Sequence, residues 1–172
     1  MGSSRSLPLA VLVASAVLGL VTGVAAVVVA TGDDDARRDA AAGVQSREPH
    51  ALRVLRAWDA ARSKAFAHGD GAALADLYVA GSRTGAADRA VLLGYRDRGL
   101  RVTGMRMQVL SAAVLRESPS RIVLLVTDVL TDAVAVDGAE RWALPHDRPS
   151  TRRVVLVRSG GRWRVAEAYA VD

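Results

Sequence analysis

The chain has no cysteine among its 172 residues, which excludes a disulfide framework and a lipid-modified cysteine. Lysine occurs once, at Lys64, so almost all of the positive charge is carried by arginine. Aromatic residues make up only 4% of the chain, and acidic residues are interspersed among the basic ones to leave a formal net charge of +5. A nucleic-acid-binding protein would concentrate its arginines beside aromatic residues that stack on bases. We therefore expect no nucleic-acid partner.

The sequence motifs of several enzyme classes are also missing. No Gly-x-Ser-x-Gly or His-Glu-x-x-His occurs, and Gly69 and Gly71 are not followed by the Gly-Lys-Ser/Thr of a phosphate-binding loop. The three histidines, His50, His68 and His146, are isolated, and none has a second ligand at metal-binding spacing. We expect neither a metal site nor a cofactor.

One long hydrophobic run is present, at residues 7–30, where 24 consecutive residues carry no charge. As a helix this run would be roughly 36 Å long, enough to cross a hydrocarbon core about 30 Å thick. We predict an uncleaved, single-pass anchor in the plasma membrane. Residues 1–6 would form a cytoplasmic tail, because a very short N-terminal tail is easily retained there, and the rest of the chain would be extracytoplasmic. The alternative is a signal peptide cleaved after Ala30, which would give a secreted protein, although the run exceeds the 7–15 apolar residues usual for such peptides.

The next segment, residues 31–48, is small and charged and lacks large apolar residues, so we expect a juxtamembrane linker. Apolar residues then recur every three or four positions between Leu52 and Phe66, which predicts a helix that begins near Pro49 and ends near Gly69.

Two further helices are expected after this one. In the stretch Gly-Asp-Gly, Asp70 can accept hydrogen bonds from the first free amide groups of a short second helix over 71–78. A third helix is predicted over 86–98, with Val91, Leu92 and other apolar residues facing inward.

The rest of the chain is rich in β-branched residues and predicts antiparallel hairpins. Residues 101–117 and 121–137 flank a Ser-Pro-Ser turn. Residues 151–159 and 162–171 flank Gly-Gly, which is a strong signal for a two-residue turn. A short strand at 141–144 lies between the two pairs. Three helices followed by four or five antiparallel strands define an α+β fold.

The stretch "AHGDGAALADLY" after the first helix, and the final "GGRWRVAEAYAV", resemble the nuclear transport factor 2-like (SnoaL-like) superfamily. This resemblance covers residues 49–172 and implies a cone-shaped domain of three helices packed on a curved antiparallel sheet. Together with the predicted anchor, the chain is similar to anchored proteins of GC-rich Gram-positive bacteria, including membrane proteins associated with mammalian-cell-entry lipid transporters. Members of the superfamily include isomerases, dehydratases and non-catalytic partner-binding domains, so the fold does not determine the function.

A catalytic function would require ionisable groups inside the cone. Asp128 shares a strand face with large apolar residues, where loss of solvation would raise its pKa and favour proton transfer. Glu167 and Tyr169 share a face of the last strand, and Tyr78 follows the second helix. These four residues are the candidate catalytic set for removing a proton next to a carbonyl group. The set resembles the Asp-plus-Tyr arrangement of steroid isomerases in the superfamily.

We favour instead a structural role for Asp128, in which it pairs with an arginine across the sheet, such as Arg106 or Arg153, and the catalytic function is the alternative. We therefore predict a non-catalytic accessory protein that binds an envelope protein or forms a homodimer. Such a protein should have a filled interior and an exposed apolar patch on the sheet. An enzyme or small-molecule carrier should instead have an enclosed pocket with an unpaired Asp128 or Glu167 pointing into it.

Overall fold

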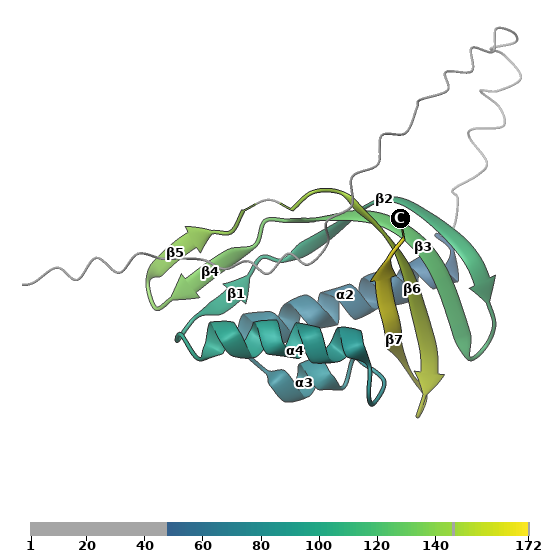
Figure 1. The fold of residues 1–172 in the computed structure, drawn as a ribbon, viewed down its shortest axis with the longest axis horizontal. Helices are drawn as coiled ribbons and strands as arrows, with labels where there is room; N and C mark the ends of the chain where they lie inside the picture. The colour runs from purple at the N-terminus through teal and green to yellow at the C-terminus, as the bar shows by residue number, and fades with distance from the viewer. Residues whose placement is uncertain (1–47, 146, 172) are drawn as a thin grey trace, which may run out of the picture.

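The computed structural model describes residues 48–145 and 147–171, in which three helices precede seven strands that form two antiparallel sheets (Figure 1). The helices are α2 (His50–His68), α3 (Gly71–Ala75) and α4 (Arg83–Arg96). The strands are β1 (Arg101–Thr103), β2 (Arg106–Glu117), β3 (Arg121–Thr131), β4 (Val134–Asp137), β5 (Glu140–Ala143), β6 (Ser150–Ser159) and β7 (Arg162–Ala170). The predicted α+β class is thus confirmed for this part of the chain.

The predicted anchor at 7–30, the tail at 1–6 and nearly all of the linker at 31–48 lie outside the described residues. Within 48–145 and 147–171, no helix is both long enough and apolar enough to cross a bilayer.

The corner between the first two helices is built as the Gly-Asp-Gly stretch predicted. Gly69 ends α2 in the left-handed conformation, with φ at 66°, which glycine adopts without steric cost. The Asp70 side chain accepts hydrogen bonds from the amides of Ala72 and Ala73 at 3.0 and 2.9 Å, and α3 begins there. The corner is therefore a helix-capping feature.

The second helix is shorter than predicted, ending at Ala75 rather than Tyr78. Beyond it, the main chain pairs with β7: the Val165 amide donates to the Leu77 carbonyl at 2.9 Å, and the Val79 amide donates to the Val165 carbonyl at 3.0 Å. A helix continued to residue 78 would have lost this parallel bridge.

The third helix begins three residues earlier than predicted and ends at Arg96. Its start is set by Ser82, whose hydroxyl accepts a hydrogen bond from the Gly85 amide at 3.1 Å. Leu92 is buried as predicted, whereas Val91 is 43% exposed, so the inward-facing stripe is narrower than the sequence indicated.

Each of the two long predicted strands is broken near one end. The break separates β1 from β2 at Gly104 and β3 from β4 at Asp132, both of which have a positive φ, 72° and 61°. The two residues face each other, because a Cβ at position 104 would lie 2.5 Å from the Asp132 carbonyl oxygen. The burial pattern changes at the break: Leu124, Val126 and Asp128 are buried before it, whereas Ala133 and Ala135 are buried after it.

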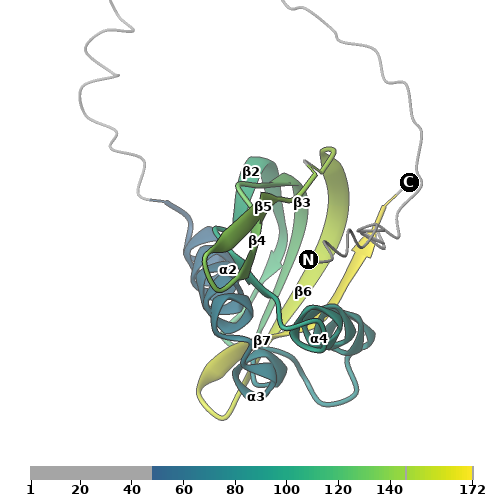
Figure 2. The same ribbon diagram turned by 90° about the vertical axis from the view of Figure 1, so that its left-hand side faces the viewer.

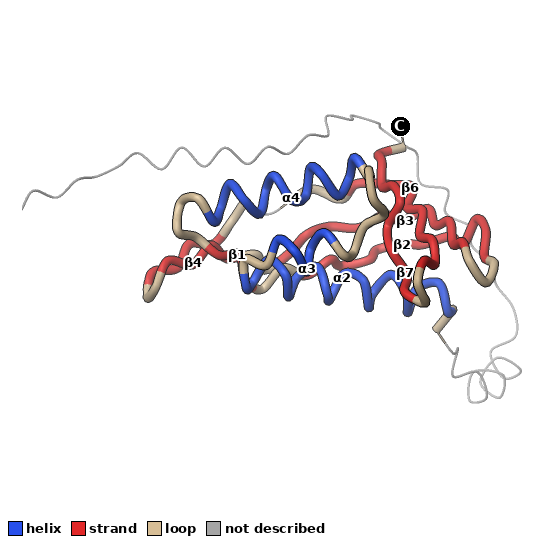
Figure 3. Tube along the Cα trace, turned by 90° about the horizontal axis from the view of Figure 1, so that it is seen from below, coloured by secondary structure: helices blue, strands red, loops and turns tan. Residues whose placement is uncertain are grey.

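Two sheets result, with strand orders β1-β4-β5 and β2-β3-β6-β7. The Ser-Pro-Ser and Gly-Gly turns join β2 to β3 and β6 to β7, as predicted. Helix α2 contacts strands of both sheets, and α3 contacts both α2 and α4. Figures 2 and 3 show α2 and α4 separated, with α3 near one end of the gap between them. Buried residues of the central core include Leu55, Phe66, Leu74, Tyr78, Leu92, Ile122, Leu124, Val126, Val154, Leu156 and Val165.

Candidate functional site

An internal cavity of about 110 Å³ lies between α2 and the inner face of the sheet β2-β3-β6-β7. Thr84 and Asp88 of α4, together with Tyr78, complete its wall. Charged side chains from four elements line this small space: Arg56, Asp59, Arg62, Asp88, Asp128 and Arg152. The other lining residues are Leu55, Trp58, Met107, Val109, Val154 and Ala168.

One cluster of charges joins α2, α4 and Tyr78. The Arg62 guanidinium donates two hydrogen bonds to the Asp88 carboxylate, at 2.6 and 2.5 Å, and the Tyr78 hydroxyl donates to the same carboxylate at 2.6 Å. Burial would lower the pKa of Arg62, but the hydrogen bonds and charge of Asp88 reverse this effect and raise it. Burial, assisted by the Asp88 charge, raises the pKa of Tyr78. Tyr78 therefore stays protonated as a hydrogen-bond donor.

Trp58 holds Tyr78 in this position. Its indole nitrogen donates to the Leu77 carbonyl at 3.0 Å, and its ring meets the Tyr78 ring edge-on with centroids 5.6 Å apart. The tyrosine is thus fixed by its neighbours and is 6% exposed.

A second pair lies on the sheet, where Asp128 of β3 accepts a hydrogen bond from Arg152 of β6. Burial raises the pKa of Asp128, and the adjacent Arg152 guanidinium limits the rise. The pairing is incomplete, because the Asp128 Oδ1 and Arg152 Nε atoms are buried without a partner among the described residues. Asp128 therefore pairs with an arginine across the sheet, as predicted, but the arginine is Arg152 and not Arg106 or Arg153. Arg106 lies 4.0 Å from Asp132 instead.

Asp59 of α2 is the carboxyl group of this cavity that has no charged hydrogen-bond partner. Its Oδ2 accepts one long hydrogen bond, from the Met107 amide at 3.4 Å. Burial raises the pKa of Asp59, the Arg62 charge partly opposes this, and the Asp128 charge adds to it. A proton on Asp59 would therefore relieve repulsion between two carboxylates that face the same cavity.

Only two of the four candidate catalytic residues, Asp128 and Tyr78, line the cavity. Glu167 and Tyr169 are exposed on the other face of β7, and Arg153 donates to the Tyr169 hydroxyl there at 2.8 Å. The cause is a register shift: Val155 pairs with Glu167 and the next residue of β6 pairs with Val165, so one residue of β7 is extra. This bulge turns the following side chains over.

The sequence interpretation assigned no role to Asp59, Asp88 or Arg152, or to Arg62, which lies within the apolar repeat between Leu52 and Phe66. A charged residue on a buried helical stripe is itself a signal, because such a side chain requires a counter-charge. No comparable signal in the sequence connects Asp88 to Arg62, since the helix that carries Asp88 meets α2 only in the folded protein.

His50 and His68 are not among the residues that line the cavity. His50 contacts Glu117 at 2.7 Å and His68 contacts the Lys64 carbonyl at 2.7 Å, both at exposed positions, whereas His146 lies outside the described residues. Over residues 48–145 and 147–171, no group of three histidine, aspartate or glutamate side chains is placed to hold a metal ion.

The two edges of the sheet β2-β3-β6-β7 present a different surface. Strand β2 is an edge strand of the sheet β2-β3-β6-β7, and most of its 12 residues are exposed. Leu110, Val114 and Leu115 are 50%, 41% and 55% exposed along it. At the opposite edge, Tyr169 and Val171 are 45% and 43% exposed.

No family model and no curated protein matches the chain. Solved structures do match, at identities that show the fold alone. The intermembrane space region of the chloroplast protein ARC6 is 18% identical, with a TM-score of 0.50 over 70% of this chain and 93% of that chain. An ntf2-like protein with a cystatin-like fold from Novosphingobium aromaticivorans is 17% identical, with a TM-score of 0.43 over 81% and 92% of the two chains. A putative dehydratase of the NTF2-like family from Streptomyces avermitilis is 11% identical, with a TM-score of 0.45 over 70% and 94%.

Proposed function

We propose that this protein is a membrane-anchored, extracytoplasmic accessory protein of the nuclear transport factor 2-like type that binds a protein partner along β2. In this proposal the chain is anchored by residues 7–30 and is similar in form to the mammalian-cell-entry-associated membrane proteins. The paired interior charges, those of Arg62 with Asp88 and Arg152 with Asp128, serve stability and not catalysis.

The interior supports a structural role for the charged residues. Pockets that bind small molecules usually have volumes of about 300–1,000 Å³, whereas this cavity has about 110 Å³. Arg62 is paired with Asp88, and Arg152 with Asp128, so the charges within it largely neutralise one another. Met107 lines the cavity, and Met105 and Trp163 both pack against the core, which is consistent with a filled cone.

The exposed edge of β2 is the observation that carries the proposal. An edge strand has unpaired backbone amides and carbonyls, and proteins usually protect such an edge with charged side chains, proline, β-bulges or a covering segment. Strand β2 has register shifts at Leu110 and Leu115, but the residues between them pair regularly with β3 and carry no charge, and Leu110 and Val114 are exposed. A partner strand added here would form main-chain hydrogen bonds and would bury these apolar side chains.

The test is crosslinking in native membranes followed by capture of the full chain. We expect the same partner to be recovered with the wild type and with Val91→Lys, an equally exposed apolar position on α4. Leu110→Lys combined with Val114→Lys should abolish recovery, because two charges would be buried in the contact. Equal recovery with this double variant would overturn the proposal. The mass of the crosslinked product distinguishes a different protein from a second copy of this chain.

Orientation is tested separately, with protease added to intact spheroplasts. We expect the domain to be digested from outside, and protection of the domain would contradict the extracytoplasmic placement.

A second candidate function is a carrier or an isomerase- or dehydratase-type enzyme that uses the interior. The observation favouring it is that Asp59 and Asp128, both with raised pKa values, face one cavity beside Tyr78. Binding of a small apolar carbonyl compound to the wild type, lost in Asp128→Asn and retained in the β2 double variant, would support this function over the first.

A further inference from the structure

We propose that a groove between α2 and the start of β7 binds an anionic phospholipid of the bilayer, with Arg53 and Arg162 at its head group. The groove has a volume of about 420 Å³ and is separate from the internal cavity, although Trp58 lines both. Its apolar wall is formed by Val54, Ala57, Ala61, Leu77 and Trp163.

The chemistry of this groove matches an amphiphile with one negative end. Arg53 and Arg162 are its two charged residues, and no carboxylate or neutral polar side chain lines it. An arginine guanidinium binds phosphate through parallel hydrogen bonds and keeps its charge at any physiological pH. The volume lies within the range of ligand-binding pockets. A ligand that fills the groove therefore needs an apolar chain and an anionic group.

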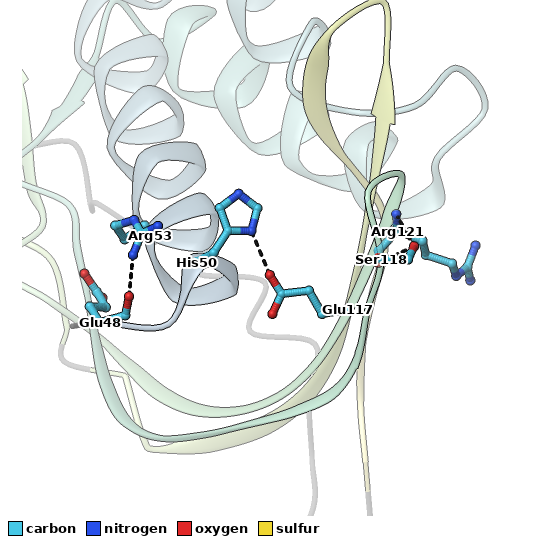
Figure 4. A network of polar contacts seen from close by, with 6 residues as sticks. All are labelled: Glu48, His50, Arg53, Glu117, Ser118 and Arg121. Carbon is cyan, nitrogen blue, oxygen red and sulfur yellow. Dashed lines mark hydrogen bonds and ion pairs between the residues drawn. The ribbon is translucent and has the colours of Figure 1, made fainter. Parts of the chain in front are cut away.

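The position of the groove adds a second argument. It lies at one end of the molecule, which we call the basic tip and define as residues 48–56, 116–121 and 158–162. Contacts hold the three segments together: His50 contacts Glu117 at 2.7 Å and the Trp163 ring, with centroids 6.2 Å apart, and the Arg158 amide donates to the Ser120 carbonyl at 2.9 Å. Figure 4 shows two of these segments meeting at His50 and Glu117.

The basic tip has a strong excess of positive charge. It contains six exposed arginines, Arg53, Arg56, Arg116, Arg121, Arg158 and Arg162. Its two acidic residues are both engaged, Glu48 with Arg56 at 3.0 Å and Glu117 with His50. At the other end of the molecule, residues 96–106 and 132–141 carry five arginines against four acidic residues. The asymmetry favours an anionic surface facing the basic tip.

The predicted membrane anchor is the reason to expect that this anionic surface is lipid. The structure begins to describe the chain at Glu48, which belongs to the basic tip, and the apolar run predicted to be the anchor ends at residue 30. The intervening 17 residues, 31–47, span at most roughly 60 Å when fully extended. If residues 7–30 cross the bilayer, the basic tip is the part of the domain to which the segment from the bilayer is attached. Tryptophan at such a boundary, here Trp163, is typical of membrane-facing surfaces.

The experiment measures lipid retention by the full chain. The purified protein in non-ionic detergent is mixed separately with phosphatidylglycerol, phosphatidylcholine and oleate, and bound lipid is measured by native mass spectrometry. We expect phosphatidylglycerol to be retained roughly tenfold more than phosphatidylcholine, with the difference reduced at high salt. Ala57→Trp fills the groove and should abolish the difference.

Matched variants separate the groove from other contacts. Ala60→Trp adds the same side chain at an exposed position of α2 outside the groove and should leave retention unchanged. Arg53→Gln with Arg162→Gln should lower phosphatidylglycerol to the level of phosphatidylcholine, whereas Arg98→Gln with Arg101→Gln, at the other end, should not. The arginine pair keeps the test valid if Ala57→Trp fails to fold.

Three results would overturn the proposal. Equal retention of both phospholipids would remove the anionic preference, and retention of oleate alone would show that a bilayer lipid is not the occupant. The absence of bound lipid under all conditions would also contradict the proposal, and this result is expected if another part of the chain fills the groove. None of these results affects the proposed protein contact at β2, which depends on Leu110 and Val114.

Discussion

At the scale of single residues, two carboxyl groups of the cavity, those of Asp59 and Asp128, lie where burial disfavours their negative charge. Asp128 is compensated by Arg152, whereas Asp59 has only the Met107 amide at 3.4 Å and the more distant charge of Arg62. Of the two carboxylates, Asp59 is therefore the one whose negative charge is less well stabilised in the folded protein. Its pKa is raised above the usual 3.8 by burial.

We expect Asp59→Asn to stabilise the protein at neutral pH. Because the pKa is higher in the folded state, the folded protein holds this proton more tightly than the unfolded chain. The associated stability is present below pH 3.8 and is lost as the pH rises through the folded-state pKa. Asparagine stays neutral and can still accept the Met107 hydrogen bond. Urea unfolding at pH 3 and pH 7 should show a higher midpoint for the variant at pH 7 only, and a gap that is largest at pH 3 would contradict this.

At the scale of elements, two glycines of α4 differ sharply in their surroundings. A Cβ added at Gly85 would lie 2.6 Å from Cγ of Tyr78, whereas one added at Gly94 would have no other atom within 4 Å. Gly94→Ala should therefore stabilise the helix by about 0.5–1 kcal/mol. Gly85→Ala should destabilise the protein by about 1–3 kcal/mol through overpacking against Tyr78. Denaturant unfolding measures both, and changes of the same sign would show that the Tyr78 contact is not tight.

The elements also show how far the sequence alone could predict this fold. Helix α2, the Asp70 cap and both hairpin turns follow from local signals, since periodicity, capping residues and Gly-Gly each act within a few positions. The break at Gly104 and Asp132 could not be located in this way, because it requires two segments that meet only in the sheet.

The candidate site was predicted only in part for the same reason. Asp128 and Tyr78 were placed correctly in the interior because each has apolar neighbours at the right spacing. Glu167 and Tyr169 were placed on the wrong side, since a single bulge reverses the alternation of β7 and leaves no clear trace in its sequence. The ion pairs could not be predicted because their partners come from different elements.

At the scale of the whole molecule, the described core is made entirely of residues from Ala51 onward. We therefore expect a chain that begins at Glu48 to fold without the preceding 47 residues. Its urea unfolding should be a single cooperative transition, with a midpoint close to that of the full chain in detergent. A non-cooperative transition would show that residues 1–47 complete the core, and circular dichroism is sufficient for the comparison.

The break between the two sheets has a consequence for access to the interior. The chain bends at Gly104 and Asp132 at one shared point, which could act as a pivot for the small sheet β1-β4-β5. Helix α2, however, contacts β1 on one side of that point and β2 and β7 on the other, so it restricts movement of one sheet relative to the other. An outward movement of the small sheet would require α2 to separate from β1, so the packing of α2 opposes opening of the domain at this point.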